Sequence, residues 1–149
     1  TPTARVNRTA QGVMRMATLG WVILALAVAG LAYIRFGPTD TDHWHRPIEA
    51  QSNQDVPGGA IRIVEVGPDS LPRVDQEMRA LPRTKVIAGS VEEGRITYET
   101  RSLIFGFPDY TTVEQAGDTL KMYARLRFGT SDMGVNRNRL ERVLRALQL

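Results

Sequence analysis

The longest hydrophobic segment of the chain is an uncharged run of 19 residues between Arg15 and Arg35. A helix rises about 1.5 Å per residue, so this run covers roughly 28 Å as a helix, close to the hydrocarbon thickness of a bilayer. Trp21 and Tyr33 stand near its two ends, as aromatic residues do at membrane interfaces. The pattern predicts a transmembrane helix over residues 16–36.

The run has a second interpretation as a cleaved signal peptide, because Ala25-Leu-Ala27 and Ala27-Val-Ala29 resemble signal-peptidase sites. Its length exceeds that of a typical signal-peptide core, which favours a retained anchor. Three arginines precede the run and one follows it directly, so the positive-inside rule predicts a cytoplasmic N-terminus. We therefore expect a basic cytoplasmic leader over residues 1–15 and a periplasmic domain beyond a bacterial inner membrane.

Small residues occur along the predicted span, among them Gly20, Ala25 and Ala29. Ala25 and Ala29 form a small-xxx-small pair, which lets another helix approach closely. The alternative is that alanine is simply common in bacterial spans. The first interpretation predicts a helical partner in the membrane.

Beyond the span the hydrophobic pattern changes to that of a small mixed domain over residues 60–149. The predicted elements, in chain order, are a strand over 61–66, a helix from Asp69 or Ser70 to Leu81, strands over 85–88, 95–102, 110–116 and 120–128, and a helix from about Asn136. The order β-α-β-β-β-β-α predicts an α+β fold, an antiparallel sheet with the helices, including a C-terminal one, on one face.

The strand over 120–128 shows the clearest alternation in the chain. Its odd-numbered positions are polar or aromatic and its even-numbered positions are apolar, so one face is expected in the core and the other in water. Arg125 and Arg127 share the expected wet face. This basic face suits lipid phosphates or an acidic partner.

Residues 37–59 are rich in glycine, proline, asparagine and aspartate, which predicts a membrane-proximal linker. Trp44 falls in this segment and is expected at the level of the lipid headgroups. His43 and His45 flank it, and Asp40 and Asp42 lie close by; these are side chains that zinc accepts. Their spacing matches no established site, and we predict no metal.

Charge and composition narrow the classes of function. The net charge of +3 comes from the three arginines of residues 1–15, and the remaining 16 basic and 16 acidic residues cancel, so there is no basic domain for nucleic acid. The chain has no cysteine, which excludes disulfides, thiolate metal sites and cysteine nucleophiles. It has no phosphate-binding glycine loop, nucleophile elbow or paired-histidine motif. We expect no enzyme activity and no cofactor.

A hydrophobic stretch over residues 103–110, broken by a glycine and a proline, is a candidate contact loop. As a loop between strands it would expose Phe105, Phe107 and Tyr110 as an apolar patch. Alternatively, Leu103 and Phe105 end a core strand and a simple turn follows. We expect the second arrangement for Leu103 and Phe105. Both arrangements remain open for Phe107 and Tyr110.

Three segments carry a resemblance to a known family: Tyr33-Ile-Arg-Phe-Gly-Pro-Thr-Asp-Thr-Asp-His-Trp-His45, Gly106-Phe-Pro-Asp109 and Ser131-Asp-Met-Gly-Val-Asn-Arg137. Together they resemble the bacterial family of domain of unknown function 1499, common in alphaproteobacteria, over roughly residues 33–149. The third segment is the most specific. Polar hydroxyl residues are frequent in that family's preceding strand, where this chain has Ala124 and Leu126. The resemblance implies no activity.

The third segment also has a structural interpretation as the entrance to the last helix. Ser131 and Asp132 can accept backbone N–H groups, Gly134 permits a positive φ, and Asn136 can cap the helix. A contact of Asp132, Asn136 and Arg137 with a ligand or partner is the alternative.

Two hypotheses of function follow from these features. The first is a non-catalytic accessory or assembly subunit, with one span docked in a larger inner-membrane complex, for example a respiratory or photosynthetic one, and a periplasmic domain for protein contacts. The second is a membrane-tethered module that binds lipid or a small apolar ligand between sheet and helices. It predicts a continuous apolar pocket lined by Met122, Leu126, Val143 and Leu147.

Overall fold

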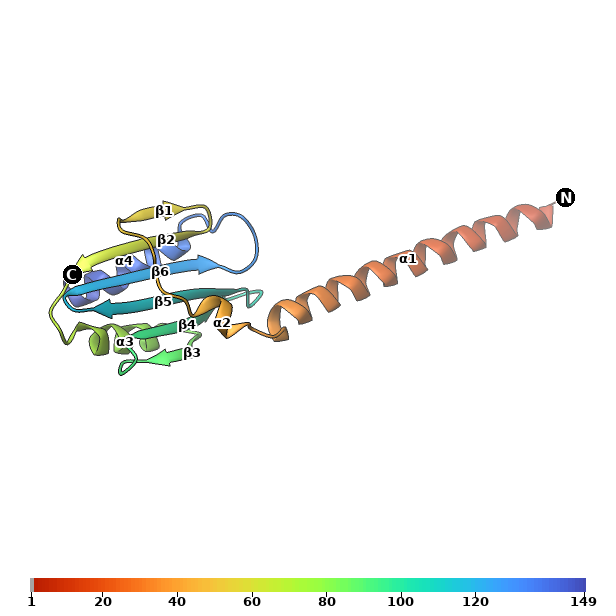
Figure 1. Ribbon diagram of the computed structural model, residues 1–149. Coiled ribbons are helices and arrows are strands. Elements are labelled where there is room, and N and C mark those ends of the chain that lie inside the picture. The colour runs from red at the N-terminus through yellow and green to blue at the C-terminus, as the bar shows by residue number, and fades with distance from the viewer. Residues whose placement is uncertain (1) are drawn as a thin grey trace. The chain divides into compact units, whose positions relative to one another are not determined.

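The computed structural model describes the backbone of residues 2–149 and the side chains of residues 10–149 (Figure 1). The chain forms two compact units that meet between Gly37 and Pro38. Arg5 and Arg8 of the predicted basic leader have side chains outside the described residues.

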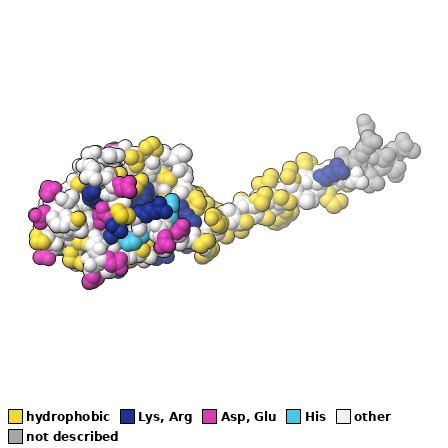
Figure 2. Space-filling model, in the orientation of Figure 1, with side chains coloured by type: hydrophobic (Ala, Val, Ile, Leu, Met, Phe, Trp, Pro, Cys, Tyr) yellow, Lys and Arg dark blue, Asp and Glu magenta, His cyan; other side chains and the backbone are white. Residues whose placement is uncertain are grey.

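The first unit is a single helix, α1 (Pro2–Phe36), which includes both the predicted leader and the predicted span. Its Ala10–Phe36 segment has a mean hydropathy of 2.1 and is long and apolar enough to cross a membrane. None of the residues in its most apolar window is buried within the chain. Figure 2 shows the resulting hydrophobic surface along the described part of this helix.

The second unit begins at Pro38 and contains all the remaining elements. They are α2 (Thr41–Trp44), β1 (Gln54–Val56), β2 (Gly59–Glu65), α3 (Ser70–Ala80), β3 (Thr84–Ser90), β4 (Arg95–Arg101), β5 (Pro108–Ala116), β6 (Thr119–Leu126) and α4 (Val135–Leu147). The six strands form one antiparallel sheet in the order β1-β2-β6-β5-β4-β3. The predicted α+β fold, with its antiparallel sheet and C-terminal helix, is confirmed.

Both α3 and α4 pack on one face of the sheet (Figure 1). The alternation in β6 sends Leu120, Met122 and Ala124 toward them, and all three are fully buried. The helices contribute apolar stripes at helical spacing, Leu71, Val74 and Met78 from α3 and Leu140, Val143, Leu144 and Leu147 from α4. This dry layer is the core of the domain, since burial of apolar surface is the main stabilising term in folding.

The predicted linker over residues 37–59 is wrong for most of its length, because residues 38–59 belong to the compact unit. Two short elements form there. Asp40 starts α2 by accepting a hydrogen bond from the His43 N–H at 3.1 Å, and β1 pairs with β2. Figure 1 shows α2 on the side of the sheet opposite α3 and α4.

Candidate functional site

The sheet face opposite α3 and α4, here called the outer face, is covered by residues 38–50, here called the strap. Trp44 of the strap stacks on Tyr110 of β5, with ring centroids 4.3 Å apart. The Trp44 carbonyl accepts hydrogen bonds from the Thr112 hydroxyl and from the Arg125 guanidinium. Trp44 is therefore part of the folded domain, and its expected position among lipid headgroups does not describe its packing.

The predicted basic face is not a wet face. The Arg125 guanidinium is enclosed between the strap and the sheet, 5.2 Å from the Trp44 ring centroid and 4.4 Å from that of Tyr123. Burial lowers the pKa of Arg125 from its usual value. Arg127 donates to the Tyr110 hydroxyl at 3.2 Å and to the Pro38 carbonyl at 2.8 Å. Both arginines hold the strap through hydrogen bonds, Arg125 to the Trp44 carbonyl and Arg127 to the Pro38 carbonyl.

The rest of the strap is held by polar contacts with the same face. His45 Nδ1 lies 2.8 Å from the Thr97 hydroxyl, and the Ile48 N–H donates to Glu114 at 3.1 Å. The Lys121 ammonium donates to the carbonyl of Ile48 at 3.0 Å. Figure 2 shows basic side chains and the histidines gathered on this side. Within the described part of the chain, no three His, Asp or Glu residues are grouped so that they could hold a metal ion.

The candidate contact loop lies between β4 and β5, and its exposed part differs from the prediction. Leu103, Ile104 and Phe105 are 76%, 78% and 55% exposed and form what we call the apolar tip. The expectation that Leu103 and Phe105 end a core strand is wrong, because β4 ends at Arg101. Tyr110 is fully buried under the strap, so it is not part of an exposed patch.

Hydrogen bonds close the base of this loop and hold the tip outward. The Ser102 N–H donates to the Phe107 carbonyl and the Phe107 N–H donates to the Ser102 hydroxyl, both at 2.9 Å. Arg101 donates to the Gly106 carbonyl at 3.0 Å, and Gly106 adopts φ +69°, which favours glycine. Phe107 is half-buried and contacts Phe128 edge-on. The tip is thus a shaped apolar surface on a closed loop.

The segment before α4 forms a helix entrance, with one change in role. Asp132 accepts the Gly134 N–H at 3.0 Å and the Asn136 N–H at 2.7 Å, and Gly134 has φ +82°. Ser131 accepts the Met133 N–H, and Arg137 pairs with Asp55 at 3.4 Å. The predicted capping role of Asn136 is wrong.

Asn136 lies inside α4, where Gly134 is the N-cap. Its side chain is fully buried, donates to the Gly58 carbonyl at 3.4 Å and accepts from Arg139. Asn136 therefore ties α4 to the β1–β2 turn and does not start the helix.

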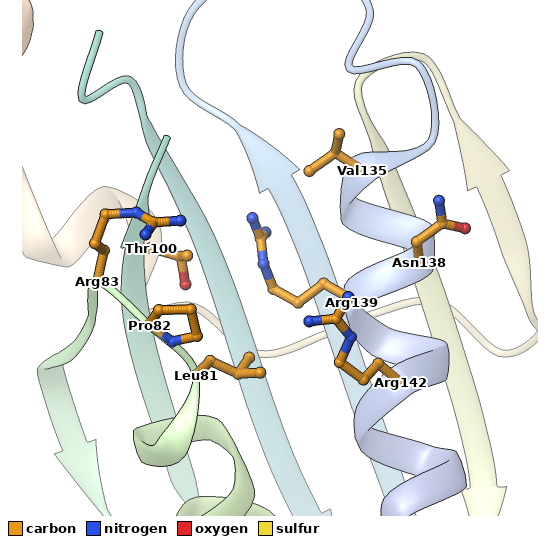
Figure 3. Close-up of a pocket in the computed structure, with 8 residues that line it drawn as sticks. All are labelled: Leu81, Pro82, Arg83, Thr100, Val135, Asn138, Arg139 and Arg142. Carbon is orange, nitrogen blue, oxygen red and sulfur yellow. The ribbon is translucent and has the colours of Figure 1, made fainter. Parts of the chain in front are cut away.

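A pocket that the sequence does not predict, here called the arginine pocket, lies on the helix side, where α3 and the first turns of α4 meet the edge of the sheet. Its volume is about 300 Å³. The lining residues are Leu81, Pro82, Arg83, Thr100, Val135, Asn138, Arg139 and Arg142. Figure 3 shows three arginine side chains extending into it, Arg83 from one side and Arg139 and Arg142 from α4 on the other. The sequence signal for this pocket is the spacing of Arg139 and Arg142, which are three residues apart and so lie on the same side of α4.

One of these arginines has a carboxylate partner. Arg139 is largely buried and donates to Asp109 at 3.2 Å. Burial raises the pKa of the Asp109 carboxyl, although Arg139 opposes this shift. Arg83 donates from Nε to the Arg101 carbonyl at 2.9 Å and has φ +57°, a strained value for a residue with a side chain. The arrangement suits recognition of an anion.

The apolar pocket predicted between sheet and helices is not formed by the residues expected to line it. Met122, Val143 and Leu147 belong to the packed core, and none is more than 6% exposed. Leu126 lies half-buried at the end of β6 and fills the space beside Gly58. This packing counts against the binding of an apolar ligand between the sheet and its helices.

The family model described as "Protein of unknown function (DUF1499)" matches residues 25–147, most of the chain. The chain belongs to this family. The DUF1499 match begins within α1 and includes the strap, the apolar tip, the α4 entrance and the arginine pocket. A search of curated proteins finds no match.

Proposed function

We propose that this protein is a non-catalytic accessory or assembly subunit, anchored by one span, of a larger inner-membrane protein complex. The observation that carries the proposal is α1, whose apolar surface is exposed along its length among the described residues. Association of helices in lipid depends on close packing of small residues, because lipid tails are as apolar as the side chains. A second helix is the partner that such a surface accommodates.

The helical geometry of α1 specifies which face that partner would contact. Ala25, Ala29 and Ala32 are spaced i, i+4 and i+7, so they share one face. Gly20 lies roughly 140° around the helix from Ala25, on a different side. The contact face is therefore the alanine face, and Gly20 does not extend it.

The proposed role of the domain, placed on the periplasmic side, is to contact the same complex through the apolar tip. Three adjacent side chains, Leu103, Ile104 and Phe105, are more than half exposed there. Exposed apolar groups in contiguous positions commonly mark interaction sites. The closed base of the loop reduces the conformational entropy lost when the tip binds. A respiratory or photosynthetic assembly is the class of host to examine first.

Substitutions on the alanine face and on the opposite face of α1 test the proposal. We expect Ala25→Leu combined with Ala29→Leu to separate the protein from its complex, because the larger side chains prevent close helix approach. Ala27→Leu is a single substitution of the same kind, roughly 200° from Ala25 on the opposite face, and should leave the complex intact. Tagged protein is extracted from native membranes in mild detergent, purified by its tag and analysed by mass spectrometry and native gel.

The proposal predicts stoichiometric recovery of integral membrane subunits with wild type and with Ala27→Leu, and at least a fivefold reduction with the double variant. Recovery of the wild-type protein alone, at one size, would overturn it. Equal recovery of the subunits with both variants would remove the alanine face from the proposal.

A further inference from the structure

The arginine pocket has more basic than acidic side chains around it. Arg83, Arg139 and Arg142 line it, and Asp109 is the carboxylate that pairs with one of them, Arg139. Among the described residues, no carboxylate forms an ion pair with Arg83 or Arg142. The nearby Asp132 carboxylate is occupied by two backbone N–H groups of the α4 entrance. Two positive charges therefore remain for an occupant.

Contacts with neighbouring residues hold the guanidinium groups of Arg139 and Arg83 at the pocket. The Arg139 side chain is only 12% exposed, which is costly for a charge, and Asn136 and Asp109 fix its orientation. Arg83 accepts the Arg101 N–H at 3.0 Å and donates back to the Arg101 carbonyl, which aims its guanidinium past Thr100 (Figure 3). A positive φ outside glycine costs about 1 kcal/mol or more, and such strain concentrates at binding sites.

The remaining lining is apolar. Leu81 and Pro82 form one wall and Val135 forms part of the opposite wall, where it is 51% exposed. A volume of about 300 Å³ lies at the lower end of the range for small-molecule sites. The pocket therefore suits an anionic group that carries a short apolar portion.

The pocket lies at the end of the domain where the chain enters it. Thr100 of the pocket pairs with Asp109, and the next pair along is Arg101 with Pro108. The Arg127 N–H donates to the Pro108 carbonyl, and its guanidinium donates to Pro38, the first residue of the domain. Pro38 therefore lies at the same end of the domain as the pocket.

We propose that this pocket binds the phosphate group of an amphiphile, with the phosphate between the guanidinium groups of Arg83, Arg139 and Arg142. Arginine is suited to this role because its planar donors match phosphate oxygens in pairs. The apolar portion next to the phosphate packs on Leu81, Pro82 and Val135. A phospholipid headgroup and a soluble phosphate ester share this chemistry. The site does not depend on the proposed accessory role.

Binding to the purified full chain in maltoside micelles tests the site. The probes are inorganic phosphate, glycerol 3-phosphate and short-chain phosphatidic acid, each titrated by calorimetry at low salt. Arg142→Gln removes an exposed arginine that has no ion pair among the described residues, and Arg83→Gln removes the other unpaired one. Arg145→Gln makes the same change on the solvent side of α4 and is the matched control.

We expect Arg142→Gln and Arg83→Gln each to weaken binding about tenfold, the usual effect of one charge-assisted hydrogen bond. Arg145→Gln should change binding less than twofold. Binding of phosphatidic acid alone supports a lipid headgroup as the source, and comparable binding of the soluble probes supports a soluble ester. The proposal is overturned if no probe binds, or if Arg145→Gln weakens binding as much as Arg142→Gln. Recovery of a membrane complex in the pull-down would be unaffected by either result.

Discussion

Asp132 determines where α4 begins, because its carboxylate satisfies backbone N–H groups that the helix leaves free. These are the N–H groups of Gly134 and Asn136, at 3.0 and 2.7 Å. We predict that Asp132→Ala lowers the free energy of unfolding by about 1–2 kcal/mol, the usual cost of losing a cap. Denaturant unfolding of the full chain in micelles, followed by the far-ultraviolet circular dichroism, measures it.

The same residue has a predictable pH dependence. Burial raises the pKa of Asp132, but hydrogen bonds from the backbone of Asn136 and Gly134 lower it by more, so the pKa lies below its ordinary value. A carboxyl with a lowered pKa stabilises the fold above the unfolded pKa, near 4, and this contribution is lost as pH falls through the folded pKa. The difference between wild type and Asp132→Ala should therefore shrink below about pH 4.

Asp132→Asn is the control, because it keeps an acceptor oxygen and should destabilise less than the alanine variant at pH 7. Equal stability of Asp132→Ala and wild type at pH 7 would contradict the capping role.

Before α4, the sequence predicts a helix entrance but assigns the cap to the wrong residue. The Ser131–Arg137 segment predicts a helix entrance with a positive φ at Gly134, and the structure has both. The sequence predicts Asn136 as the cap because asparagine favours the N-cap position. Its partners, Gly58 and Arg139, include a residue 78 positions away, and that contact exists only after β1–β2 and α4 have packed. Local pattern contains no signal for it.

The strap covers the outer face of the sheet, which the sequence predicts to be in contact with water. Its central contact is the Trp44 carbonyl, which accepts from Thr112 and from the enclosed Arg125 guanidinium. We predict that Arg125→Met loosens the strap, because it removes charge-assisted hydrogen bonds while keeping most of the side-chain volume. Hydrogen exchange of a peptide spanning residues 38–50 should accelerate at least tenfold, since local opening becomes less costly.

Arg79→Met is the matched control for this experiment. Its guanidinium pairs with Asp75 on α3 at 2.9 Å, and among the described residues it forms no hydrogen bond or ion pair with the strap. Exchange of the strap should stay at the wild-type rate in this variant. An unchanged rate in Arg125→Met would show that ring stacking and the other polar contacts hold the strap without the arginine.

The longer elements were predictable because burial on one side imposes a period on the sequence. The alternation in β6 and the apolar stripes of α3 and α4 identified those elements to within about two residues. The strap, α2 and β1 were missed because each is short and lies among turn-forming residues. Burial of β5 on both faces, from Tyr110 to Val113, also follows from the strap and has no signature in β5 itself.

The connection between α1 and the domain is much shorter than the sequence predicts. The sequence predicted 23 residues between span and domain, over 37–59, whereas the domain begins at Pro38. A long linker would let the domain search a wide volume for partners. In the structure a single residue, Gly37, separates the end of α1 from the first residue of the domain.

The orientation of the chain across the membrane is directly testable, because the sequence has no cysteine. Three arginines before the span predict that residues 1–15 are cytoplasmic and that the domain is periplasmic. Single-cysteine variants Asn7→Cys and Asp118→Cys have no background thiol in the protein itself. In intact cells with a permeable outer membrane, a membrane-impermeant maleimide should label Asp118→Cys at least tenfold more than Asn7→Cys, and lysis should equalise the two. Preferential labelling of Asn7→Cys would reverse the topology, and equal labelling before lysis would exclude a retained span with one orientation.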